Sequence, residues 1–212
     1  GLYRMVKLVT VPENHFCMEY AGSNGIKVTP EVTILDAGAK KADAEVTVEL
    51  WIEGKSADVM VTVGGEKKSV PVEHGYAKAV FDLTDVHLWD GVDDPYLYTA
   101  KAELSDGDSV ETTFGCRSFS IDPQKGFFLN GRSYPLRGVS RHQDRAGAGN
   151  ALTNEMHRED MEIIKELGAN TIRLAHYQHA QEFYDLCDEN GMIVWAEIPY
   201  ITMHMSDGTE NT

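Results

Sequence analysis

Polar side chains follow two short apolar stretches in the second half of this 212-residue chain. His176 comes directly after residues 170–175, and His142 and Asp144 come after residues 136–139. Imidazole and carboxylate groups can each hold a polar ligand by hydrogen bonds. At the carboxyl ends of parallel strands, such groups form the active sites of α/β barrels. These positions therefore predict a candidate site, although a loop histidine taken alone is more often a solvated side chain.

Arg173 stands inside the second apolar stretch, between Ile172 and Leu174. A guanidinium among apolar residues needs an anion, because an unpaired buried charge is costly. A structural salt bridge is one interpretation of such an arginine, and a functional anion is the other.

A strand–helix–strand–helix–strand pattern surrounds these residues. The predicted strands are residues 136–139, 170–175 and 192–197, and the predicted helices are residues 156–167 and 180–190. Gly168 and Gly191 are typical residues for the ends of the two helices. The alternation predicts a parallel sheet with right-handed crossovers. The last strand is an apolar run, which is typical of a strand covered on both faces. Three strands are roughly the first third of a (β/α)8 barrel.

Residues 14–121 alternate between apolar and polar side chains with the period of β-strands. Ala44, Val46, Val48 and Leu50 form one such series, and Asp106-Gly107 is a hairpin-turn signal. About seven short strands in about 100 residues favour an immunoglobulin-like sandwich. The fold class expected is therefore multidomain: an immunoglobulin-like β-sandwich followed by a truncated (β/α)8 barrel, its βαβαβ portion.

The composition excludes several classes of function. The net charge of −15 argues against a nucleic-acid partner. No apolar run approaches the roughly 20 residues that span a bilayer, so we expect no membrane partner. Cys17, Cys116 and Cys187 are scattered and predict neither a disulfide framework nor a zinc site. We expect a soluble protein, with the cytoplasm and the periplasm both open.

Residues 170–197 resemble the first signature of family 2 glycoside hydrolases, the group of β-galactosidases and β-glucuronidases. The shared positions are Asn170, Arg173, His176, Tyr177, Phe183, Tyr184, Asp188, Gly191 and the run from Met192 to Trp195. Leu174 and Gln178 depart from the family, which usually has a small residue and often a proline there. Residues 137–144 resemble the family's R-G-V-N-R-H-E-[HD] motif, with Ser140 and Gln143 as departures.

Weaker resemblances cover the rest of the chain. Residues 88–99 resemble the L-W…P-Y-L-Y motif of the family's sandwich domain. Residues 127–132 resemble an F-x-L-N-G-[KR] hairpin that lids the bottom of its barrel. Residues 1–4 resemble the end of its N-terminal sugar-binding sandwich, so we expect this chain to belong to a longer polypeptide.

The resemblance implies roles for five residues. His142, Asp144 and His176 would bind sugar hydroxyls. Arg173 would hold the nucleophilic glutamate, and Glu197 would be a supporting structural acid.

The resemblance places both catalytic glutamates outside this chain, after the fourth and seventh barrel strands. Asn154-Glu155 has the sequence of the acid/base motif but opens a helix, where an acid suits the helix dipole. Glu210 lies in the tail. We predict no cofactor and no metal: His204 falls near a histidine that some relatives use beside Mg²⁺, but Thr202 replaces the accompanying carboxylate.

These observations predict three parts: residues 1–13 as the end of an N-terminal sandwich or a linker, residues 14–121 as the immunoglobulin-like domain, and residues 122–212 as the start of the barrel. The longer protein is expected to be a retaining exo-glycosidase that hydrolyses terminal β-D-galactosides through two carboxylates about 5 Å apart. This chain alone would be inactive.

Alternatives remain open at this point. Within the family they are a β-glucuronidase or a β-mannosidase, and outside it a non-catalytic carbohydrate-binding or interaction module. The expected partners are the sugar substrate and the remainder of the same polypeptide, and a homo-oligomer is left open.

Overall fold

The computed structural model describes residues 4, 6–18, 22–105 and 107–199. The chain divides into two compact units. The sandwich unit comprises Leu8–Asp90 and Tyr96–Ser133, and the barrel unit comprises Gly1–Lys7, Gly91–Pro95 and Tyr134–Thr212.

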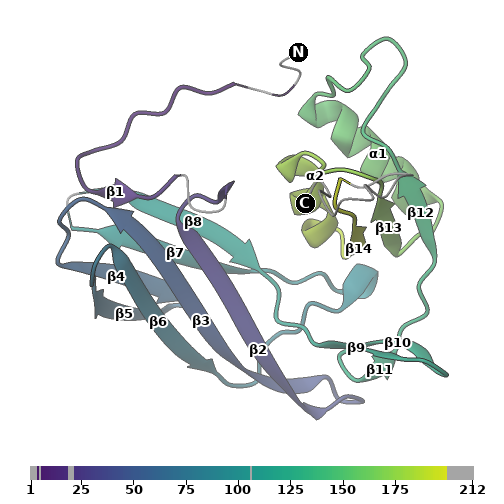
Figure 1. Ribbon diagram of the computed structural model, residues 1–212. Helices are drawn as coiled ribbons and strands as arrows, with labels where there is room; N and C mark the ends of the chain where they lie inside the picture. Colours follow the sequence, from purple (N-terminus) through teal and green to yellow (C-terminus); the bar gives the residue numbers. More distant parts are fainter. Residues whose placement is uncertain (1–3, 5, 19–21, 106, 200–212) are drawn as a thin grey trace, which may run out of the picture. The chain divides into compact units, whose positions relative to one another are not determined.

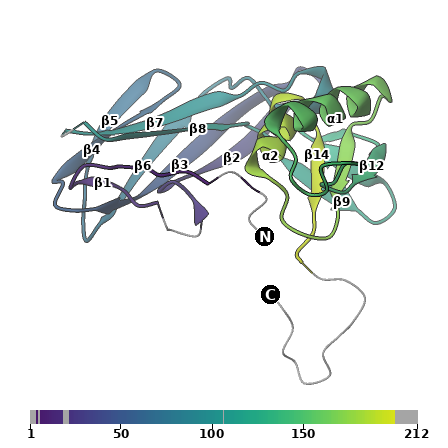
Figure 2. The same cartoon turned by 90° about the horizontal axis from the view of Figure 1, so that it is seen from above.

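Two antiparallel sheets form the sandwich unit (Figures 1 and 2). The first contains β1 (His15–Phe16), β2 (Ile26–Asp36), β3 (Lys41–Glu53) and β6 (Tyr76–Leu83), with β3 paired to the other three. The second has the order β5 (Glu66–Pro71), β4 (Asp58–Val63), β7 (Tyr98–Leu104) and β8 (Ser109–Phe114). Sequence-adjacent and distant strands thus combine into the two layers expected of a sandwich.

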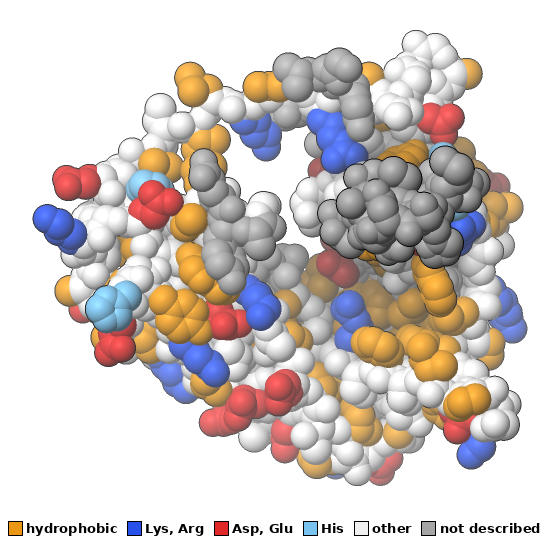
Figure 3. Space-filling model, in the orientation of Figure 1, with side chains coloured by type: hydrophobic (Ala, Val, Ile, Leu, Met, Phe, Trp, Pro, Cys, Tyr) orange, Lys and Arg blue, Asp and Glu red, His pale blue; other side chains and the backbone are white. Residues whose placement is uncertain are grey.

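Alternation along the strands fills the space between the two sheets. Val46, Val48 and Leu50 of β3 are fully buried, and so are Val61 and Ala102 of the other sheet. The intervening side chains face outward, where Lys27 and Glu49 form an ion pair of 3.0 Å. Figure 3 shows acidic and basic side chains interspersed with hydrophobic ones on the face it presents. The predicted alternation is confirmed as the origin of this core.

The sandwich unit also carries a three-stranded sheet at its C-terminal end. It consists of β9 (Phe119–Asp122), β10 (Gly126–Leu129) and β11 (Arg132–Ser133). Asn130 and Gly131 form the expected tight turn, with φ of 51° and 74°. The Asn130 amide donates to the Trp89 carbonyl and to the Asp90 carboxylate, both at 3.1 Å. These bonds hold the hairpin against the segment at Trp89 and Asp90 within the same unit.

The barrel unit contains the βαβαβ pattern predicted from the sequence. Its elements are β12 (Gly138–Arg141), α1 (Asn154–Glu166), β13 (Thr171–Leu174), α2 (Gln181–Glu189) and β14 (Ile193–Ala196). The strands are parallel in the order β12-β13-β14. Thr153 caps α1 by accepting a hydrogen bond from the Met156 amide at 3.4 Å. Glu155 lies in the first turn of α1, as expected.

One expectation for the third strand is wrong. We expected β14 to be covered on both faces, but Trp195 is 62 % exposed. The apolar side chains of α1 and α2, such as Met161 and Phe183, cover one face of the sheet. Among the described residues β14 pairs only with β13, so it is an edge strand.

Cys116 of the sandwich unit and Cys187 of the barrel unit are small core side chains, whereas Cys17 is half-buried. Burial raises the pKa of the Cys116 thiol to about 11 and that of Cys187 to about 12. Both thiols are therefore protonated and unreactive near neutral pH. No helix among the described residues is long and apolar enough to cross a membrane.

Candidate active site

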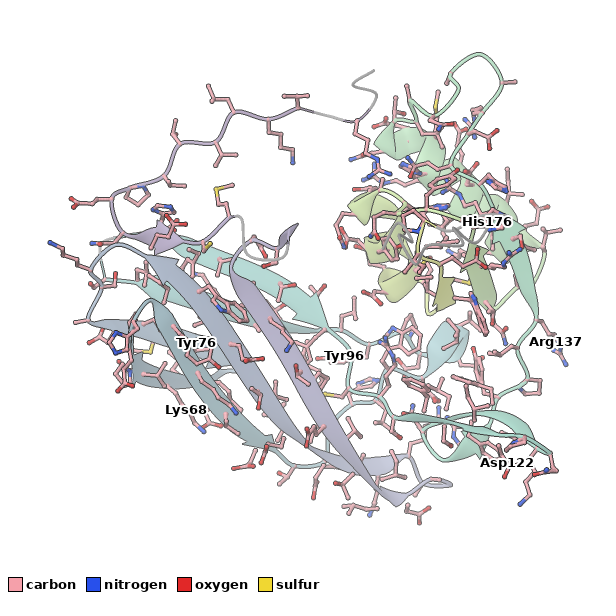
Figure 4. The ribbon with its side chains drawn as sticks, viewed as in Figure 1. Lys68, Tyr76, Tyr96, Asp122, Arg137 and His176 are labelled. Atoms are coloured by element: carbon pink, nitrogen blue, oxygen red, sulfur yellow. The ribbon has the colours of Figure 1, made fainter. Side chains whose placement is uncertain are left out.

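The carboxyl ends of the three parallel strands bring Arg173, His176 and Glu197 into direct contact. Arg173 projects from β13, His176 follows that strand, and Glu197 follows β14. Figure 4 labels His176 among the side chains of the barrel unit and Arg137 on the segment that leads into β12. The parallel register aligns Arg173 with Trp195, which carries Glu197 to the same end.

Glu197 is the anion at the centre of this contact. Its Oε1 accepts a hydrogen bond from Arg173 Nε at 2.6 Å, and its Oε2 lies 2.6 Å from His176 Nδ1. A carboxylate only accepts hydrogen bonds, so His176 donates through Nδ1–H. The hydrogen bond from Arg173, followed by that from His176, holds the pKa of Glu197 below its ordinary value. Glu197 is therefore ionised and links the two side chains.

This contact corrects our expectation for Arg173. We placed its anion outside this chain, whereas the structure pairs it with Glu197. The Arg173 side chain is also 45 % exposed rather than buried. It lies on the face of the sheet that the helices leave open, so its remaining N–H groups can reach a second anion.

His142 and Asp144 lie on the loop after β12. The His142 ring is 5.5 Å from the His176 ring, in an edge-to-face arrangement. His142 and Asp144 are both exposed. The structure thus brings His142 to the cluster and leaves Asp144 on the same loop in solvent.

A cluster of four buried polar side chains lies behind the carboxyl ends of these strands, and the sequence analysis did not predict it. Arg141, Gln143, His157 and His179 are each at most 6 % exposed. Gln143 joins the loop after β12 to the loop after β13. Its backbone N–H donates to the Tyr177 hydroxyl at 2.9 Å, and its side-chain Oε1 accepts from the Ala180 backbone N–H at 2.6 Å. The available signal was a run of polar residues interrupting an apolar strand end, which does not reveal distant partners.

The described residues contain no group of three or more His, Cys, Asp or Glu side chains that could hold a metal ion. Thr202 and His204, considered above for a metal site, and Glu210, considered for a catalytic carboxylate, lie outside the described residues. Two imidazoles, a guanidinium and a carboxylate at an exposed edge can bind a hydroxyl-rich or anionic ligand by hydrogen bonds. A polar cluster at the carboxyl edge of a parallel sheet is the arrangement of an α/β-barrel enzyme.

Comparison with known families identifies the class further. Residues 19–117 match the family described as glycosyl hydrolases family 2, and residues 121–212 match the family 2 TIM barrel domain. The chain belongs to glycosyl hydrolase family 2. The predicted family and the predicted fold class, an immunoglobulin-like sandwich followed by part of a TIM barrel, are confirmed.

Relatives cover nearly the whole chain. A β-glucuronidase from Bacteroides fragilis is 38 % identical over 95 % of this chain and 31 % of its own length. A crystal structure of an FMN-binding β-glucuronidase from Facaelibacterium prausnitzii L2-6 has a TM-score of 0.84 and 44 % identity, covering 94 % of this chain and 31 % of that one. A β-galactosidase from Thermoanaerobacterium thermosulfurigenes is 39 % identical over 60 % of this chain and 18 % of its own length.

The chain thus spans about a third or less of the length of these relatives. They are family 2 glycosidases, more often β-glucuronidases than β-galactosidases. The expectation that this chain is part of a family 2 glycosidase is confirmed.

Proposed function

We propose that this chain is part of a retaining β-glucuronidase. The observation that supports this proposal is that the relative at 38 % identity, aligned with 95 % of the chain, is named a β-glucuronidase. The domain limits 1–13, 14–121 and 122–212 belong to the same proposal. The substrate is a terminal β-D-glucuronide, and the remaining barrel strands come from the rest of the polypeptide.

In this proposal the described residues form one side of the sugar subsite. His176 is held by Glu197 through Nδ1, so it binds a sugar hydroxyl through Nε2. His142 stands beside it and binds a neighbouring hydroxyl, with Asp144 on the same loop. Arg173 keeps Glu197 on one side and supports the nucleophile with its exposed N–H groups.

The reaction follows from these roles together with two carboxylates supplied from outside this chain. In a retaining glycosidase one carboxylate attacks the anomeric carbon while the other protonates the leaving oxygen, and water then hydrolyses the glycosyl-enzyme. Hydrogen bonds to sugar hydroxyls strengthen at the transition state, which is where His142 and His176 act.

Kinetics of the whole protein test the sugar assignment. We expect kcat/KM for an aryl β-glucuronide to exceed that for the matched β-galactoside and β-mannoside by at least roughly 100-fold, because a site built for the sugar carboxylate is left unpaired by the others. The second candidate is a β-galactosidase, favoured by the relative at 39 % identity. A preference for the galactoside would establish that candidate and overturn the first.

A further inference from the structure

Behind the candidate site, one buried guanidinium joins three elements. Arg141, at the end of β12, donates through Nε and Nη2 to Asp160 Oδ2 of α1, at 3.1 and 2.7 Å. The same group contacts His157 Nδ1 at 2.9 Å and His179 Nδ1 at 3.2 Å. It also lies over the Phe183 ring of α2, 3.8 Å from the ring centre. The positive charge is thus paired and fully surrounded.

Arg141 determines the protonation of both histidines. A guanidinium has only donors, so each Nδ1 that it contacts must be an acceptor. Both rings are therefore neutral and carry their proton on Nε2. Burial, and after it the charge of Arg141, lowers the pKa of His157 to about 4. Burial likewise lowers the pKa of His179, although its bond to Ala175 opposes the shift.

The fixed tautomer gives His179 a specific target. Its Nε2–H donates to the backbone carbonyl of Ala175 at 3.2 Å. Ala175 directly precedes His176, so the accepting carbonyl belongs to the peptide group that joins Ala175 to His176, the proposed sugar contact. His179 also stacks on Tyr177, with ring centroids 5.0 Å apart. The loop is held at a second point by Arg4, whose guanidinium donates to the Gln178 carbonyl.

We propose that His179 is a positioning residue for His176: Arg141 holds it as the Nε2–H tautomer, and it fixes the Ala175 carbonyl and hence the backbone that carries His176. His157 does not share this role. It binds the same guanidinium with similar burial, but it belongs to α1 and not to the site loop. The inference rests on the proposed glycosidase function, in which His176 contacts the sugar.

Variants of the whole protein separate positioning from mere support of the fold. We expect His179→Ala to lower kcat/KM for an aryl β-glucuronide by roughly 10- to 100-fold, because small misplacements at a reacting site cost about that much. His179→Gln should recover most of the loss, since its amide can accept from Arg141 and donate to Ala175. His157→Ala is the matched control. We expect it to lower Tm about as much as His179→Ala does, while its kcat/KM stays within about twofold of wild type.

A double-mutant cycle with His176→Ala identifies the route of the effect. If His179 acts through His176, adding His179→Ala to His176→Ala should change kcat/KM by no more than about twofold. Equal losses for His157→Ala and His179→Ala, or an undiminished His179→Ala effect in the His176→Ala background, would overturn the proposal. So would full activity of a folded His179→Ala enzyme.

Two further results keep the outcomes distinct. Wild-type protein that prefers another glycoside refutes the proposed substrate, and the same cycle is then measured on that glycoside. Wild-type protein that cleaves no aryl glycoside overturns both proposals. If His179→Ala does not fold, His179→Gln is compared with His179→Asn, whose shorter side chain cannot reach both partners; equal, wild-type activity of the two overturns the positioning role.

Discussion

At the scale of single residues, the central finding is that Glu197 binds both Arg173 and His176. Each contact is 2.6 Å, so the carboxylate couples a strand residue to a loop residue. The supporting role that the family resemblance implied for Glu197 is retained as a proposal. Arg173 and His176 nevertheless face different tasks, and their loss should have different kinetic consequences.

Arg173→Ala and His176→Ala should fail differently in the whole protein. Removing the guanidinium takes a positive charge from beside the proposed nucleophile, so we expect kcat to fall and the acid limb of the pH–rate profile to move to higher pH. Removing the imidazole should lower kcat/KM by an amount equivalent to roughly 1–3 kcal/mol of transition-state binding. The acid limb of the profile should move little. Profiles of kcat and kcat/KM against pH, with thermal melts as controls, check this. An unmoved limb and unchanged kcat in Arg173→Ala would mean that its ion pair with Glu197 is its whole role.

The neutral His157 predicts a pH dependence of stability. Its folded pKa is about 4, below the ordinary value of 6.5, so between these pH values the unfolded chain binds more protons than the native one. The free energy of unfolding should therefore fall as pH decreases from about 6.5 to 4, by as much as roughly 3 kcal/mol from this group. Urea melts of wild type and His157→Gln across this range measure it, and parallel curves for the two proteins would contradict the assignment.

At the scale of elements, two helices of the barrel unit end in the same conformation but in different surroundings. Gly168 follows α1 and Gly191 follows α2, each with φ of 72°. A Cβ at Gly168 would meet nothing within 4 Å, whereas one at Gly191 would overlap the backbone carbonyl of Gly91. The two positions therefore separate the cost of left-handed backbone from the cost of a steric clash.

Gly168→Ala should destabilise by about 1–2 kcal/mol, the cost of a left-handed non-glycine residue. Gly191→Ala should lower the free energy of unfolding by more than this, because the Gly91 backbone must also move to make room for the new Cβ. Denaturant melts of the two variants, read at equal slope, give the comparison. Equal losses would show that the contact between Gly91 and Gly191 relaxes at no cost.

At the scale of the whole molecule, the two units differ in how completely they bury their apolar surface. The sandwich encloses its core between two sheets. The three-stranded parallel sheet leaves Trp195 of β14 and Leu167 after α1 exposed, at 62 % and 69 %. Parallel sheets are normally covered on both faces, so the barrel unit lacks protection that the sandwich has.

This difference predicts unequal stability within the isolated chain. Residues 14–121 should fold alone, whereas residues 136–212 should be weakly protected or should associate between chains. Amide hydrogen exchange on the isolated chain, with its mass measured by light scattering, tests this. Equally strong protection of β14 and β3 in a proven monomer would contradict it.

The isolated chain should also have no glycosidase activity. The proposed mechanism needs an acid/base and a nucleophilic carboxylate that come from outside this chain, so neither leaving-group protonation nor a covalent intermediate is possible. Assays with aryl β-glucuronides and β-galactosides check this. Turnover that is lost when a residue within the chain is mutated would refute it.

Local sequence patterns were sufficient to predict the strands and helices of this protein and its family. Alternation such as Val46, Val48 and Leu50 predicted the sandwich, because side chains along a strand point alternately to its two faces. The apolar strands with polar residues after them predicted the barrel portion and placed His142 and His176 at one edge. These are local patterns, so they can be read without knowing the partners.

The contacts between distant side chains depend on the three-dimensional fold and could not be predicted from local patterns. The register of β13 and β14 pairs Arg173 with Glu197, a partner 24 residues away that we had sought outside the chain. The buried Arg141 contacts His157 of α1 and His179 of the loop before α2, and the tautomers of both histidines follow from these contacts. A hydrogen bond depends on distances of a few tenths of an ångström between residues far apart in sequence, and no local pattern carries that information.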